Sequence, residues 1–166
     1  MKYLTLEDYF KPSPSITLAG LTEEQVKQRF LECTTFLEQL DTNAKNSTKV
    51  LCIAINILCL YCRKFSFDEF DRYLACGVAH FLASKICYNN KHNIDWYKQY
   101  CHMKKPLPKP MKGKKAVTVV AEYTEQVKEK LHQECMQIEI DMLTTLGFDF
   151  EFELAFDYIR FYFNNK

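Results

Sequence analysis

The chain has 166 residues, of which 48% are apolar and 26% are charged, with a formal net charge of +1. This length and apolar content suffice to bury one sizeable core, so we expect one domain rather than two. The near-neutral charge removes the electrostatic argument for a whole-molecule nucleic-acid or membrane-surface binder. No stretch approaches the roughly 20 consecutive apolar residues that a membrane-spanning helix requires.

Residues 1–20 are predicted to form an irregular lead-in, because Pro12 and Pro14 each bias the preceding residue away from helix. A first helix is expected after Thr22, since Thr22 and Gln25 have the spacing of a capping box. Its apolar residues recur every three or four positions, which predicts a one-faced helix. They are Val26, Phe30, Cys33, Leu37 and Leu40.

Two further helices follow. The segment "KVLCIAINILCLYCRK" is apolar nearly all round, so we expect it to be the central helix of the fold, surrounded by others. A second capping-box pattern, Ser66 with Glu69, predicts the start of a third helix that runs to about Ile86.

Residues 88–116 lose this periodicity, apart from a short helical pattern around "IDWYKQY". Within them, "KKPLPKPMKGKK" is too basic and proline-rich to order itself, which predicts a mobile loop over about 103–116. Three interpretations stay open for this loop: a solvated segment without function, a nuclear-import signal, or phosphate contacts with nucleic acid. Its lysines are Lys104, Lys105, Lys109, Lys112, Lys114 and Lys115.

A long helix is predicted from about Val117 to Leu146, with Gly147 placed to end it. One face of this helix is apolar through Val127, Leu131, Cys135, Ile138 and Met142. The aromatic segment "EFELAFDYIRFYF" is expected to form a final short helix, although strand stays an alternative there and for "AVTVV". The predicted fold class is therefore all-α, with about five main helices.

Eight cysteines would indicate a disulfide framework in a secreted protein, but the first twenty residues hold no continuous apolar signal segment. We therefore expect reduced thiols in a soluble intracellular protein. Five of the cysteines occupy apolar helical positions, where a free thiol acts as a small hydrophobe. These are Cys33, Cys52, Cys59, Cys76 and Cys135.

Metal binding and catalysis have weak support in the sequence. The CxxC pair Cys59 and Cys62 lies in a buried apolar helix without a second pair. His80 is interpreted as a core histidine, because no nucleophile or acid gathers around it. We expect no metal, cofactor or enzymatic activity. The alternative is a zinc site formed by a looser set of ligand types, which are Cys87, His92, Cys101 and His102.

Four stretches, in order, resemble the cyclin box, especially that of the transcription-type K, T and C cyclins. They are "PSPSITLAGLTEEQ", "FSFDEFDRY", "LACGVAHFLASKICYN" and "QIEIDMLTTLGFDF". The resemblance covers most of the chain. It implies a five-helix cyclin-box bundle over residues 21–166 around a buried central helix, with the basic loop between the third and fourth helices.

In cyclins a lysine at the end of the third helix and a glutamate on the fourth clamp the mobile regulatory helix of a kinase. The matching residues are Lys85 and Glu139, and Phe81, Ile86 and Met142 would supply apolar contacts beside them. A lysine near a helix C-terminus is also favoured by the helix dipole, with its stem on apolar surface. The alternative is that Lys85 only caps its helix while Glu139 faces solvent.

The sequence also departs from the family pattern. Two glutamates that follow the lysine in cyclins are Cys87 and Tyr88 here. A buried arginine and its polar partner match Phe30 and Cys59, an exchange that packing can compensate. The "HP" before the fifth helix is "LA" at residues 154–155.

The resemblance implies a regulatory subunit that binds and activates a cyclin-dependent-type serine/threonine kinase, related to transcription. Its expected location is the nucleus, or both nucleus and cytoplasm. Phosphoryl transfer, with ATP and magnesium, would belong to the kinase. The alternative, which the missing glutamates favour, is a cyclin-fold scaffold that binds another protein or a nucleic acid without activating a kinase. Cyclins usually carry two boxes, and this sequence holds about one.

Overall fold

The structure, a computed structural model, describes residues 11–44, 47–87, 125–152 and 154. Within these ranges all regular elements are helices, which confirms the all-α prediction. No helix among them is both long and apolar enough to cross a membrane. The elements are α2 (Pro14–Thr17), α3 (Glu23–Ala44), α4 (Thr48–Cys62), α5 (Arg72–Ile86) and α7 (Glu125–Leu146). The basic loop and most of the predicted C-terminal helix lie outside the described residues.

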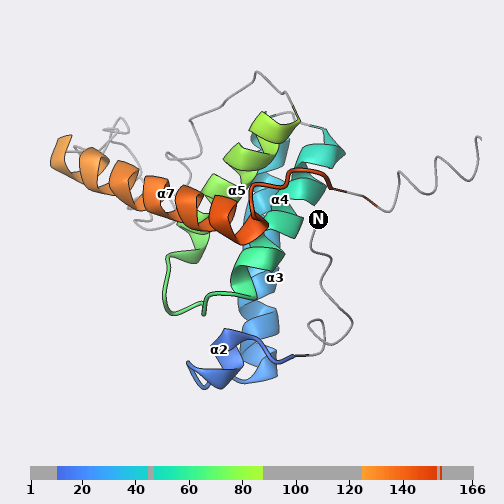
Figure 1. Ribbon diagram of the computed structural model, residues 1–166, viewed down its shortest axis with the longest axis vertical. Coiled ribbons are helices and arrows are strands. Elements are labelled where there is room, and N and C mark those ends of the chain that lie inside the picture. The colour runs from blue at the N-terminus through green and yellow to red at the C-terminus, as the bar shows by residue number, and fades with distance from the viewer. Residues whose placement is uncertain (1–10, 45–46, 88–124, 153, 155–166) are drawn as a thin grey trace, which may run out of the picture.

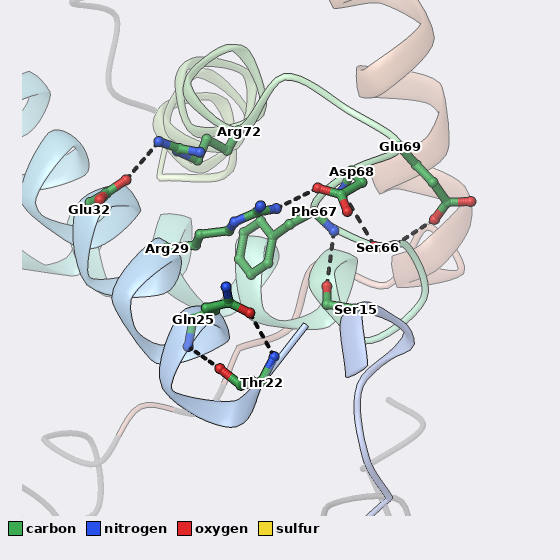
Figure 2. Close-up of polar contacts among 10 residues, drawn as sticks. All are labelled: Ser15, Thr22, Gln25, Arg29, Glu32, Ser66, Phe67, Asp68, Glu69 and Arg72. Carbon is green, nitrogen blue, oxygen red and sulfur yellow. Dashed lines mark hydrogen bonds and ion pairs between the residues drawn. The ribbon is translucent and has the colours of Figure 1, made fainter. Parts of the chain in front are cut away.

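The predicted capping box at the start of α3 is confirmed (Figure 2). The backbone N–H of Thr22 donates to Gln25 Oε1 at 2.9 Å, and the backbone N–H of Gln25 donates to Thr22 Oγ1 at 3.2 Å. Two N–H groups that have no partner within the helix are thereby satisfied. The start of α3 is therefore fixed by local hydrogen bonds.

The predicted start of the third helix is wrong by five residues. Ser66 and Glu69 do interact, since the Glu69 carboxylate accepts the backbone N–H of Ser66, but these residues form a turn. The helix begins at Arg72, after the N-cap Asp71. Asp71 Oδ1 accepts two backbone N–H groups, those of Tyr73 at 3.0 Å and Leu74 at 3.2 Å. A local side-chain bond can stabilise a turn as readily as a helix start, which explains the error.

The most buried helix is α5, although the sequence favoured α4 as the central helix. Ten of the fifteen residues of α5 are buried, against seven of the fifteen in α4. Small residues at Ala75, Gly77, Ala79 and Ala83 let neighbouring helices approach the α5 backbone closely. Three helices, α3, α4 and α7, pack against α5, and α7 crosses it steeply (Figure 1). Helix α4 also packs against three helices, α3, α5 and α7, as its apolar sequence predicted, so the two helices share the centre of the bundle and α5 is the more buried.

The predicted apolar face of α7 is confirmed over its described side chains. Leu131, Cys135, Ile138 and Met142 are buried. The helix ends at Gly147 as expected, where φ is +62°. The Phe148 N–H donates to the Leu143 carbonyl at 3.0 Å and the Gly147 N–H to the Thr144 carbonyl at 3.1 Å. This pattern is a Schellman motif. It requires a residue in the left-handed conformation, which glycine adopts at little cost.

The lead-in contains one regular turn that the sequence did not predict. Helix α2 begins at Pro14, whose fixed φ and missing N–H suit the first helical position. Ser15 is completely buried, and its Oγ accepts the backbone N–H of Phe67 at 2.9 Å (Figure 2). The lead-in is thus attached to the connection between α4 and α5.

We expect Asp71→Ala to lower the free energy of unfolding by about 1 kcal/mol, because two backbone N–H groups lose their acceptor. Asp71→Asn should keep most of the stability, since an asparagine side chain caps equally well. Urea denaturation followed by circular dichroism measures both. Equal stability of the alanine variant and the wild type would contradict the capping role.

Candidate functional site

The two charged residues implied by the cyclin resemblance meet in the structure. Lys85 lies in the last turn of α5, and its Nζ is 2.7 Å from Glu139 Oε1 on α7. The ammonium also lies 4.0 Å from the ring centroid of Phe81, one turn earlier on α5. The lysine and glutamate side chains are 43% and 26% exposed. They form a surface ion pair that joins the last turn of α5 to the C-terminal half of α7.

The three apolar residues expected beside this pair differ in burial. Phe81 and Ile86 are half-buried, and Ile86 packs against the core. Met142 is completely buried, so its side chain packs inside the bundle and offers no surface to a partner. Met142 therefore contributes to the position of α7 beneath the ion pair.

The structure adds exposed apolar residues that the sequence did not single out. Met136 and Ile140 are one helical turn apart on α7, and Glu139 follows Met136 by three residues, so all three are neighbours on the helix surface. Beyond the end of α7, Phe148 is 64% exposed and has a left-handed φ of +57°. Phe150 is also exposed. The sequence signal for these exposed residues was "LGFDF", in which two phenylalanines follow the helix-ending glycine within three residues.

The departures from the cyclin pattern lie at packed positions. Cys87 is the C-cap of α5, and its backbone N–H donates to the Ala83 carbonyl at 3.0 Å. Partial burial raises the pKa of the Cys87 thiol. Phe30 packs against the core and Cys59 is half-buried. Tyr88 lies outside the described residues.

The structure gives no support to the metal and redox alternatives. Among the described residues, no three histidine, cysteine or acidic side chains gather closely enough to hold a metal ion. Cys59 and Cys62 are free thiols whose pKa values are raised by burial, which disfavours the thiolate needed for metal binding or redox chemistry. Of the looser zinc set, only Cys87 is described, and His92, Cys101 and His102 lie outside.

His80 forms the buried polar contact between α5 and α3. Its Nε2 lies 3.3 Å from Asp41 Oδ1, and both residues are buried. Since a carboxylate can only accept, Nε2 carries the hydrogen of this bond. Burial lowers the pKa of His80 below its ordinary 6.5, and the neighbouring Asp41 only partly offsets this. The interpretation of His80 as a core residue therefore agrees with its surroundings.

Comparison with known proteins gives no independent evidence of identity. No protein-family model matches the chain, and no curated protein matches it.

The His80 contact makes stability depend on pH. Because the folded state holds the pKa of His80 below 6.5, the unfolded chain binds a proton more readily. The contribution of neutral, buried His80 to the free energy of unfolding should therefore be fully present above pH 6.5. It should be lost as the pH falls through the lowered pKa of the folded state. Urea unfolding between about pH 5 and pH 7.5 measures this change.

His80→Gln should flatten that pH dependence, because glutamine does not titrate. His132→Gln is the matched control, since His132 is exposed on α7. A pH profile that is the same in wild type and His80→Gln would contradict the assignment.

Proposed function

We propose that the protein is a cyclin-like regulatory subunit, with a cyclin-box fold, that binds and activates a cyclin-dependent-type serine/threonine kinase. The observation that carries the proposal is the meeting of Lys85 and Glu139 across α5 and α7. These two residues, 54 positions apart, are the pair that the resemblance assigns to kinase binding. A transcription-related role in the nucleus is part of the same proposal and rests on the resemblance alone.

The ion pair keeps hydrogen-bonding capacity for a partner. Lys85 has three N–H donors and the structure gives one of them to Glu139, whose second carboxylate oxygen has no hydrogen bond among the described residues. A partner could therefore place a backbone carbonyl against the ammonium and a backbone N–H against the carboxylate. Such a pair would fix the orientation of an incoming helix, while nearby apolar residues supply contact area.

Activation would follow from differential binding. A subunit shifts a kinase between two states only if it binds one of them more tightly. Because α5 and α7 are held by the core, the relative position of Lys85 and Glu139 is set before a partner arrives. A preformed surface loses less binding free energy to ordering. Phosphoryl transfer would remain the chemistry of the kinase, with its ATP and magnesium.

The alternative is a cyclin-fold scaffold that binds a protein without activating a kinase. One observation favours it: Cys87 stands where the family has a glutamate. Co-purification from cells followed by a kinase assay distinguishes the two functions. A recovered kinase whose activity rises on binding supports activation, whereas a stable complex without kinase activity supports the scaffold.

Lys85→Glu should weaken kinase binding at least tenfold, because it places a like charge beside Glu139 and removes the ammonium. The ion pair is exposed, so its loss should cost less than about 1 kcal/mol of stability and leave the fold intact. Isothermal titration with the co-purified kinase measures binding. Lys130→Glu is the matched control, since Lys130 lies on the exposed face of α7.

The double variant Lys85→Glu with Glu139→Lys separates recognition from structure. It rebuilds the ion pair with reversed polarity, so a purely structural pair would regain full binding. Our proposal expects binding to stay weak, because the partner reads which end is positive. Full recovery in the double variant would contradict it.

Phe148→Gly should weaken kinase binding several-fold while leaving the free energy of unfolding equal or slightly higher. The phenylalanine ring is exposed, so little packing is lost, and glycine adopts the positive φ without steric cost. Binding and urea denaturation are measured on the same preparation. Leu18→Ala, another exposed apolar position, is the control for unspecific loss of surface. Unchanged kinase affinity would exclude Phe148 from the interface.

A further inference from the structure

The lead-in carries a serine followed directly by proline, Ser13–Pro14, in an extended backbone. Ser13 has φ −66° and ψ 156°, and it precedes the first turn of α2. Kinases directed by proline recognise this dipeptide in an extended substrate. The two residues before it, Lys11 and Pro12, are exposed. The local sequence and conformation therefore match the substrate of a proline-directed kinase.

The hydroxyl of Ser13 lies in an unfavourable environment while the lead-in, with α2, is docked, that is, packed against the rest of the bundle. Its Oγ is buried and has no hydrogen-bond partner among the described residues. A phosphate there would bring nearly two negative charges and three acceptor oxygens into a place that offers no donor even to a hydroxyl. The four residues of α2 are too few for a helix dipole that could compensate. A phosphorylated Ser13 is thus incompatible with the docked position.

We propose that phosphorylation of Ser13 by a proline-directed serine/threonine kinase releases α2 from the bundle. The Ser13 Oγ attacks the γ-phosphorus of ATP, and the new Oγ–P bond replaces the bond to the β,γ-bridging oxygen. ADP leaves, and the hydroxyl proton passes to the carboxylate base of the kinase. The kinase acts on the undocked lead-in, and the phosphate then prevents docking, which traps the open state.

Docking of α2 depends on a small number of contacts. Ser15 Oγ accepts the Phe67 N–H (Figure 2). The Ser15 carbonyl accepts the Leu21 N–H at 3.0 Å. Leu18, by contrast, is 77% exposed. Release would leave the Phe67 N–H without its acceptor, next to the Ser66–Glu69 turn and the Arg29–Asp68 ion pair. The connection between α4 and α5 would then become accessible to solvent.

This regulation is independent of the proposed function. Phe67 precedes the N-terminal end of α5, whereas Lys85 lies in its last turn. A helix rises 1.5 Å per residue, so the start of α5 and Lys85 are separated by roughly 20 Å. The phosphate would therefore alter a different end of the molecule, whatever partner binds at the Lys85–Glu139 pair.

The test incubates the full chain with ATP and an active proline-directed kinase, and locates phosphate by tandem mass spectrometry. We expect one phosphate on Ser13 in the wild type, and none at this position in Ser13→Ala or Pro14→Ala. Ser15→Ala should be phosphorylated roughly three- to tenfold faster, because loss of the buried hydrogen bond populates the undocked lead-in. Leu18→Ala is the matched control and should react at the wild-type rate. Circular dichroism checks that both variants keep their helix content.

Hydrogen exchange on the phosphorylated wild type gives a readout that does not depend on any variant. The Phe67 amide should lose its protection when Ser13 carries phosphate, while amides in the middle of α5 keep theirs. Failure to phosphorylate Ser13 in both wild type and Ser15→Ala would overturn the proposal. Equal rates in these two proteins, or an unchanged Phe67 amide after phosphorylation, would overturn it as well.

Discussion

The structure depends on the burial of α5 between three other helices. Its small residues, among them Ala79 and Ala83, allow α3, α4 and α7 to approach closely, and ten of its fifteen residues are buried. Close packing of this kind leaves a helix little freedom to rotate or slide. The last turn of α5 is therefore held against α7, which brings Lys85 within 2.7 Å of Glu139. The candidate site is a consequence of how the core is packed.

Features that depend on periodicity or on a few neighbouring residues could be predicted from the sequence. The capping box at Thr22, the buried face of α7 and the end at Gly147 all follow from patterns within a few residues. The start of α5 was missed because a capping-box pattern at Ser66 closes a turn instead. The helix expected to be central, α4, does pack against three others, but α5 is more deeply buried, and its small residues in "LACGVAHFLAS" gave less apolar signal than the long apolar run of α4.

The candidate site was predicted only in part, for a similar reason. Family resemblance placed Lys85 and Glu139, but residues so far apart in sequence reveal their contact only in the folded chain. Met142 was expected to contact a partner, although the periodicity of α7 also placed it on the apolar face, and it is buried there. Phe148 was overlooked because exposure after a helix end depends on the left-handed backbone of the Schellman motif. Packing details of this kind lie beyond a pattern of residue types.

We infer that the last turn of α5 and the C-terminal half of α7 form one partner surface, centred on the Lys85–Glu139 pair. Hydrogen exchange on the chain, alone and in complex with a kinase of the proposed class, tests this most directly. We expect new protection in the last turn of α5 and around residues 136–150, with little change along the exposed side of α3. Protection confined to α2 and α3, with none near Lys85, would contradict it.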